Sequence, residues 1–303
     1  MSAAPVPQRE GAARAPRDAL ITGATAMLGM LVLGAILVPI MSHRDPIGIG
    51  DVLATRLAPP LSRDHAGAFH LLGTDRFGRD LFVRMMLAAR VSLFVGLVGS
   101  LLAAVLGTAV GAVAGWRGGA VDRIAMAVTD ACLAIPRMVL LLLCVALWRP
   151  GVATVIVVLA ATGWMGVARI IRGEVQGVRT QSYVEAAISI GASDRRVLWL
   201  HVLPNAIGPA IVAATLGVGN AVLLESGLSF LGLGIQPPRP SWGNMIAGGR
   251  DLIMTAPWVA LAPGVALIVT VLCVTLIGDS LRDRVAGETV TAPATSPPPS
   301  PAR

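Results

Sequence analysis

Residues 183–204 read YVEAAISIGASDRRVLWLHVLP, a polar, helix-prone segment set between two long apolar runs. Glu185 to Gly191 favours a helix, and the sequence Gly191-Ala192-Ser193 interrupts it because glycine adopts backbone angles that other residues avoid. Ser193 or Asp194 can cap a second helix over residues 195–203. Pro204 then marks the turn back into the apolar run. We therefore predict a helix–turn–helix between two long apolar helices.

The composition around this segment is that of a membrane protein. The chain has 303 residues, of which 55% are hydrophobic and only 14% are charged, and its mean hydropathy is +0.75. Soluble domains carry about 25% charged residues. Several apolar runs are long enough to cross about 30 Å of hydrocarbon. The predicted fold class is therefore all-α: a polytopic membrane protein.

Six apolar runs predict six transmembrane helices. The first is too long for the apolar core of a signal peptide and has no small-residue cleavage site, so we expect it to remain as an anchor. The third contains Pro136, and an amphipathic helix over 73–90 is expected to lead into the second. The predicted spans are residues 20–41, 91–115, 124–148, 152–170, 206–231 and 258–277.

The same runs divide the chain into four parts. Residues 1–19 and 286–303 are rich in Ala, Pro, Arg or Ser and are expected to be disordered cytoplasmic tails. Residues 20–72 form an anchor helix followed by an extracytoplasmic loop, and residues 73–285 form the main transmembrane domain. Six spans place both termini on one side.

Arginine counts indicate which side that is. All 24 basic residues are arginine, and 13 fall in the segments that share a side with the termini, against three in the two short loops opposite. The long loop at 42–90 carries seven more, which weakens the bias. Part of that loop lies beyond the zone where the positive-inside rule acts strongly, but Arg79, Arg84 and Arg90 lie close to a span. We expect both termini and the 183–204 segment to be cytoplasmic.

The spacing within 183–204 carries a family resemblance. Glu185-Ala186-Ala187, then Gly191, then His201-x-Leu203-Pro204, resembles the EAA loop of permease subunits of binding-protein-dependent ABC importers. In that family this loop seats in a groove of a separate ATPase, and the resemblance places Glu185 and Gly191 at the contact. The residues expected to form the coupling loop are Tyr183, Glu185, Ala186, Ala187, Gly191, Ala192, Ser193, His201, Leu203 and Pro204.

Further motifs are similar to the C-type subunit of dipeptide, oligopeptide and nickel permeases, and the resemblance covers residues 15–285. They do not specify the cargo: peptides are the first expectation, and nickel or another small solute is the alternative. The motifs are Leu72-Gly73-Thr74-Asp75, Gly78-Arg79-Asp80, Ala89-Arg90-Val91-Ser92-Leu93, Leu228 to Gly234, Gln236-Pro237-Pro238, Pro240-Ser241-Trp242-Gly243 and Gly278 to Asp283.

The resemblance implies an assembly in the bacterial cytoplasmic (inner) membrane, embedded in the lipid bilayer. Its other members would be a second homologous permease subunit, two ATP-binding subunits and an extracytoplasmic solute-binding protein. The chain would be a transport subunit, not an enzyme, that works by alternating access. With no Lys anywhere it cannot build a Walker A loop, so ATP and Mg belong to the partners. We expect no cofactor, metal or nucleic acid on this chain.

Polar residues within the apolar runs are candidates for the pathway or gate. Ionisable groups in a membrane are costly, so those that are present usually serve a function. Asp130 and Arg137, seven residues apart, would share one face of the third span and could line the pathway or pair across subunits. Alternatively, Asp130 lies near the cytoplasmic end of the span and is simply solvated. Asn220 and Glu225 lie in the fifth span and should face the bundle, where they could line the translocation path or contact the second permease. Trp242 lies in a loop near the expected extracytoplasmic gate. Separately, Gly107, Gly111 and Gly115 form a small-residue face for helix packing.

Two other classes of function fit less well. A secondary transporter commonly shows internal repeats with paired broken helices, and no convincing repeat is present. An intramembrane enzyme would require a motif such as HExxH or GxSxG, or paired membrane aspartates, and the sequence has none of them. Neither class explains one ordered cytoplasmic loop.

Overall fold

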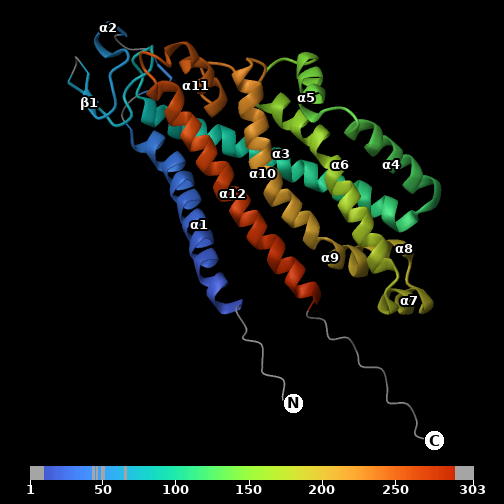
Figure 1. Ribbon diagram of the computed structural model, residues 1–303. Helices are drawn as coiled ribbons and strands as arrows, with labels where there is room; N and C mark the ends of the chain where they lie inside the picture. The colour runs from blue at the N-terminus through green and yellow to red at the C-terminus, as the bar shows by residue number, and fades with distance from the viewer. Residues whose placement is uncertain (1–9, 43–44, 46, 49–51, 65–66, 291–303) are drawn as a thin grey trace, which may run out of the picture.

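The computed structural model describes residues 10–42, 45, 47–48, 52–64 and 67–290 (Figure 1). Long helices run side by side along the molecule. Within these residues, five helices are long and apolar enough to cross a membrane, and the bent pair α4–α5 can form a sixth passage. The spanning elements are α1 (Glu10–Met41), α3 (Leu81–Arg117), α4 (Gly119–Leu133) with α5 (Arg137–Ala146), α6 (Val152–Arg179), α10 (Gly208–Phe230) and α12 (Trp258–Val290).

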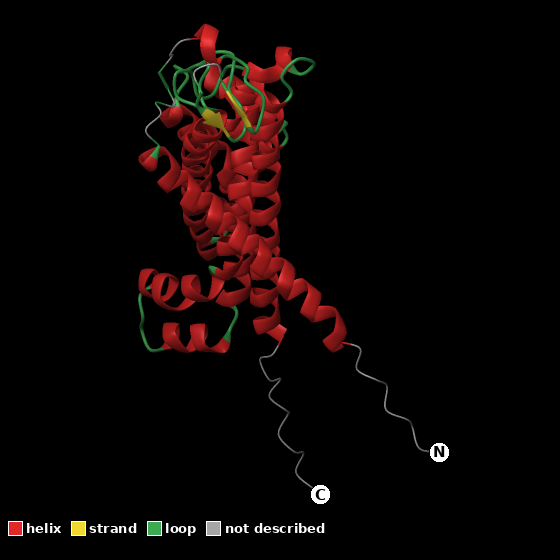
Figure 2. Cartoon of the chain, turned by 90° about the vertical axis from the view of Figure 1, so that its left-hand side faces the viewer, coloured by secondary structure: helices red, strands yellow, loops and turns green. Residues whose placement is uncertain are grey.

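Short elements close the two ends of this bundle (Figure 1). At one end lies a cap, formed by the described residues of 52–80 and 232–257. It contains α2 (Val52–Thr55), β1 (Ser62–Arg63), β2 (Phe69–His70), α11 (Trp242–Gly249) and the 3-10 helix η2 (Arg250–Leu252). The two strands pair antiparallel, with Ser62 opposite His70. At the other end lies the segment from α7 to α9, and α1 begins and α12 ends toward that same end (Figures 1 and 2).

Helix α3 is the centre of the bundle and packs most extensively against α6. The glycine face predicted on the second span makes this contact. A Cβ at Gly107 would lie 2.5 Å from the carbonyl oxygen of Trp164, and one at Gly111 would lie 2.4 Å from that of Ala168. Such distances are far below van der Waals contact, so the two backbones approach this closely only because these positions lack a side chain. The packing role predicted for these glycines is confirmed.

The third predicted span is not one continuous helix. Helix α4 ends at Leu133, α5 begins at Arg137, and the two axes are bent by 89°. Pro136 stands at the start of α5, where it has no N–H to continue the hydrogen bonds of α4. The residue before a proline is also disfavoured in the helical region. The prediction that Asp130 and Arg137 share one face of a helix is therefore wrong.

Several helices extend beyond the apolar runs that predicted them. Helix α1 begins at Glu10, inside the predicted disordered tail, and α12 continues to Val290, past the predicted boundary at 286. Residues 1–9 and 291–303, the remainder of both predicted tails, lie outside the described residues. Helix α6 continues to Arg179. Apolar length predicts what can cross a membrane, whereas backbone hydrogen bonds can continue a helix through polar residues.

The amphipathic helix predicted over 73–90 begins only at Leu81. Gly73 and Gly78 have φ angles of +78° and +75°, so the chain turns before the helix instead of entering it. Asp80 then caps α3 by accepting a hydrogen bond from the backbone N–H of Val83, 3.1 Å away.

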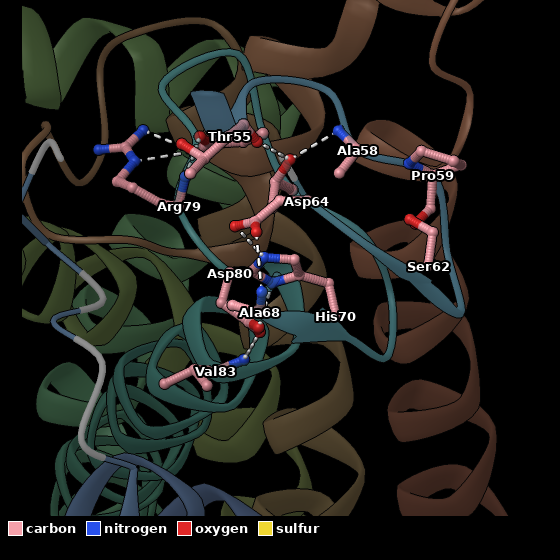
Figure 3. A network of polar contacts seen from close by, with 12 residues as sticks. Thr55, Ala58, Pro59, Ser62, Asp64, Ala68, His70, Arg79, Asp80 and Val83 are labelled. Carbon is pink, nitrogen blue, oxygen red and sulfur yellow. Dashed lines mark hydrogen bonds and ion pairs between the residues drawn. The ribbon is translucent and has the colours of Figure 1, made fainter. Parts of the chain in front are cut away.

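The cap is held by a buried network of charged side chains (Figure 3). His70 lies between two carboxylates: Nδ1 is 2.7 Å from Oδ2 of Asp80, and Nε2 is 3.0 Å from Oδ2 of Asp64. Beside it, Asp75 accepts from the backbone N–H groups of Phe77 and Arg79 and pairs with the Arg79 guanidinium at 2.7 Å. These contacts fix the loop that precedes α3 and so position the start of that helix.

Candidate functional site

The 183–204 segment, here called the EAA loop, folds as a helix–turn–helix. Its elements are α7 (Ser182–Ser189), α8 (Asp194–Val197), the π-helix η1 (Leu198–Val202) and α9 (Leu203–Ala206). Gly191 forms the turn with φ of +88°, and an added Cβ there would meet no atom within 4 Å. Glycine is therefore required at this position by the backbone angle and not by lack of space.

Two details of the loop differ from the sequence prediction. Ser193 occupies the N-cap position of α8, but its side chain makes no capping hydrogen bond. Pro204 does not end a helix; it is the second residue of α9, which continues directly from the π-helix η1. The chain turns into the bundle at Ile207, and α10 begins at Gly208.

One face of the EAA loop is packed into the bundle. Val184 and Ala187 of α7 lie in a cluster with Trp116 of α3 and Val175 of α6, together with Leu203, and Val184 is fully buried. Arg179 reinforces this attachment: its Nη1 donates to the carbonyl oxygen of Trp116 at 2.8 Å, and its guanidinium lies over the Trp116 ring. A push on the loop would therefore be transmitted to α3 and α6.

The opposite face of the loop is free on this chain. Tyr183, Glu185, Ala186, Gly191 and Ser193 are exposed, Ala192 and His201 are half-buried, and Pro204 is exposed. Ile190 is 86% exposed at the tip of the turn, and Ile188 of α7 is 44% exposed. No described residue pairs with the Glu185 carboxylate. Figure 2 shows the two short layers of the loop projecting from the side of the bundle. Apolar side chains beside an unpaired carboxylate are typical of a docking surface.

The two charged candidates of the third span have separate surroundings. Asp130 lies on α4, is exposed, and forms an ion pair with Arg169 of α6. A second pair joins the same two helices, since Nη2 of Arg172 lies 2.6 Å from Oδ2 of Asp122. Arg137, on the first turn of α5, has its guanidinium beside Gly163 in the middle of α6. Asp130 thus helps to hold α4 in place, while Arg137 is exposed on this chain with one guanidinium nitrogen beside α6.

The candidates of the fifth span also differ from each other. Asn220 is exposed on this chain and does not face the chain's own helices, so its role in the pathway or in contact with a second permease stays a prediction. Glu225 is fully buried, as predicted, but it is enclosed by serines instead of lining an opening. Its Oε1 accepts from the Ser229 hydroxyl at 2.7 Å, and the same hydroxyl accepts from the N–H of Ile235. Glu225 therefore anchors the start of the cap to α10.

Trp242 lies in a helix and not in a loop, as the first residue of α11, and its side chain is fully buried. It packs with Leu81 and Met85 of α3, and its backbone N–H donates to the hydroxyl of Ser92 at 3.3 Å. Within the described part of the chain its indole Nε1 has no hydrogen-bond partner. Gly243 allows this burial, since a Cβ there would lie 2.1 Å from the carbonyl oxygen of Ser226.

Sequence reasoning missed the pairing of His70 with Asp64 and Asp80. The three residues are separated by six and ten positions, and only the hairpin β1–β2 and the turn at Gly78 bring them together. The one local signal was Asp80 directly before the first long apolar helix of the domain, which is an N-cap position. Within the described residues there is no group of His, Cys, Asp and Glu that could hold a metal.

Comparison with known proteins agrees with this architecture. The family model for inner membrane components of binding-protein-dependent transport systems matches residues 107–287. The chain belongs to this family. It is similar to a putative peptide transport system permease protein of Brucella suis, with 39% identity over 85% of this chain and 84% of the relative. It is also similar to the oligopeptide transport system permease protein OppC of Bacillus subtilis, with 35% identity over the same two fractions.

The fold has been seen in a solved transporter. An inward-facing structure of the MetNI methionine ABC transporter superposes with a TM-score of 0.55, covering 68% of this chain and 96% of that chain at 21% sequence identity. The chain is therefore a multi-pass inner membrane protein and the permease subunit of an ABC importer, as the sequence predicted. Its substrate, its partners and the roles of single residues are proposals.

Proposed function

We propose that this permease forms part of the pathway of a peptide importer and is driven by separate ATPase subunits through the EAA loop. The exposed face of that loop carries the proposal: Glu185, Ile190 and Gly191 project from a segment whose other face is anchored to α3 and α6. ATP binding would draw two ATPase subunits together and move the loop. The anchored helices would then switch the bundle between inward-open and outward-open states.

The proposed assembly contains a second homologous permease, two ATP-binding subunits and an extracytoplasmic solute-binding protein. Exposed apolar side chains along the spanning helices leave room for the second permease as well as lipid; one such surface, between α3 and α9–α10, is lined by Leu101, Val105, Trp199 and Ile211. ATP and Mg would bind only to the ATPase subunits. Peptides are the proposed cargo because the permeases of Brucella suis and Bacillus subtilis are named as peptide or oligopeptide systems.

Mass spectrometry of the complex that co-purifies with this chain tests the assembly. Native-membrane extracts of the wild type should yield a second permease and Walker-containing ATPases. The double variant Glu185→Arg, Gly191→Pro should keep the second permease and lose the ATPases. Asp251→Arg is the matched control, because Asp251 is exposed at the cap. A wild-type chain that purifies alone, or a control that loses the ATPases equally, contradicts the proposal.

Uptake assays test the cargo. Cells that lack this chain should fail to accumulate labelled di- and oligopeptides, and complementation should restore uptake. Restored uptake of nickel without peptide uptake would replace the peptide proposal with the nickel alternative. An electrochemical ion gradient should be dispensable, since a requirement for one would instead indicate a secondary transporter.

The proposed orientation places both termini and the EAA loop in the cytoplasm and the cap outside. An Ile190→Cys variant should react with an impermeant thiol reagent only after the cells are opened. An Arg63→Cys variant, exposed on β1, should react in intact cells. The opposite pattern would invert the orientation. The native cysteines Cys132, Cys144 and Cys273 should be replaced by alanine first.

A further inference from the structure

The guanidinium of Arg137 borders a small cavity in the middle of the bundle. The cavity has a volume of about 50 Å³ and lies where α3, α6 and α10 converge. Its walls are largely small residues, among them Gly99, Ser100, Gly163 and Gly217. A Cβ at Gly163 would lie 3.0 Å from Nη2 of Arg137, so the absence of a side chain there admits the guanidinium.

This cavity is deep in the membrane region. Gly163 lies about 17 Å along the axis of α6 from its first residue, at 1.5 Å per residue. Ser100 and Gly217 lie near the middle of α3 and α10 in the same way. Because the hydrocarbon core is about 30 Å thick, the Arg137 guanidinium is close to its midplane.

Within the described residues, Arg137 forms no ion pair and no hydrogen bond. The nearby membrane carboxylates are used elsewhere: Asp130 pairs with Arg169, Asp122 pairs with Arg172, and Glu225 is enclosed by serines. An unpaired arginine in the middle of a membrane is costly and normally faces a water-filled space or an anion. The Ser100 hydroxyl is not available as a hydrogen-bond donor to a group in the cavity, because it already donates to the carbonyl oxygen of Ala214 at 2.7 Å.

We propose that Arg137 is a carboxylate-binding site for the transported solute, contacted as the solute passes the middle of the bundle. A carboxylate matches the planar donors of a guanidinium and can accept two parallel hydrogen bonds. The cavity exceeds the 10–15 Å³ that one water requires, so it holds water or one small polar group. This inference rests on the proposed peptide cargo, because every unmodified peptide ends in a carboxylate.

A carboxylate could also come from a side chain of the second permease. Arg137 is itself exposed on this chain. The structure favours the solute, because the guanidinium borders a cavity lined by α3, α6 and α10 of its own chain. A partner side chain would have to enter between those helices and leave again whenever they move. A mobile solute can reach the cavity during each cycle without such a constraint.

Transport by the complete importer in proteoliposomes tests the site. A peptide is compared with its C-terminal amide, each bound to the solute-binding protein to the same occupancy, which native mass spectrometry verifies. Wild type should transport the acid faster than the amide. Arg137→Met should slow the acid about tenfold, the effect of one lost charge-assisted contact, and leave the amide unchanged. Arg137→Lys should restore part of the preference for the acid.

The control is Arg149→Met, the same substitution at another exposed arginine, just after α5, which does not line the cavity. It should change neither rate. Equal slowing of acid and amide by Arg137→Met would overturn the proposal and indicate a structural role or a pair with the second permease. Unchanged transport of both would overturn it as well.

A second measurement does not depend on peptide transport. In a background without native cysteines, an Arg137→Cys variant should react with a water-soluble anionic thiol reagent in at least one nucleotide state of the importer. No reaction in any state would overturn the proposal, since the site would then be closed to water. If the wild type transports neither peptide form while the thiol reacts, the cargo proposal fails. The transport test is then repeated with the solute that the importer does carry, in an acidic and a neutral form. Arg137→Met must still slow transport of the acidic form and leave transport of the neutral form unchanged.

Discussion

Replacing Gly191 by alanine should weaken the binding of the ATPase subunits without unfolding the permease. The backbone at Gly191 has φ of +88°, and a left-handed conformation costs a residue with a Cβ about 1–2 kcal/mol. No atom lies within 4 Å of the added methyl group, so steric overlap within the chain contributes nothing. If the turn must keep its shape to dock, this strain lowers the affinity roughly 5- to 30-fold.

The assay is the affinity of the purified permease pair for the ATPase subunits in nanodiscs, measured beside the Tm of the permease pair alone. Gly191→Asn should restore much of the affinity, because asparagine tolerates positive φ better than alanine. Gly232→Ala is the matched control: Gly232 has φ of +77°, also with nothing within 4 Å, but lies in the cap. The permease pair that carries Gly232→Ala should bind the ATPase subunits with the same affinity as wild type.

The reasoning fails in two ways that can be distinguished. If Gly191→Asn binds as weakly as Gly191→Ala, any side chain is harmful and the cause is contact with the ATPase instead of backbone strain. If Gly191→Ala binds like wild type, the shape of the turn does not contribute to docking. A loss of Tm that matches the loss of affinity would assign the effect to general instability.

Three further substitutions probe the scaffold. Gly111→Leu should abolish the yield of monodisperse permease, because even a Cβ would lie 2.4 Å from a carbonyl oxygen of α6. Gly166→Leu is the control and should leave that yield unchanged, because a Cβ at Gly166 would have nothing within 4 Å. Asp80→Ala should lower the free energy of unfolding by about 1–3 kcal/mol through the lost helix cap and the lost contact with His70, and make the cap more sensitive to protease. Glu225→Ala should lower the Tm and expose residues near Ile235 to hydrogen exchange, because the Ser229 hydroxyl loses its acceptor, whereas an unchanged exchange pattern would contradict an anchoring role.

Features encoded over a short stretch of sequence were predicted correctly. The apolar runs indicated the spanning helices because hydrocarbon thickness sets their length directly. The helix–turn–helix of the EAA loop followed from Gly191 and from its polar composition between two such runs. The close packing of Gly107 and Gly111 followed from their spacing, because residues four apart lie on one face of a helix.

Features that depend on direction or on distant contacts were not predicted. Pro136 signals a break, but hydropathy does not specify an 89° bend, so Asp130 and Arg137 were placed on one face that does not exist. Trp242 was placed in a Gly/Pro-rich loop, yet it begins α11, which packs onto α3 and buries it. The contacts of His70 arise only when two turns bring its partners together.

The EAA loop and the Arg137 cavity share the same three helices. The cluster under the loop includes Trp116 of α3, Val167 of α6 and Ala210 of α10, and the cavity is also lined by α3, α6 and α10. Val167 contributes to both. Because the small-residue contact between α3 and α6 leaves no space to absorb a displacement, a movement of the loop must shift these helices together and change the shape of the cavity. The proposed coupling to ATP and the proposed contact with the solute carboxylate therefore require no separate relay between them.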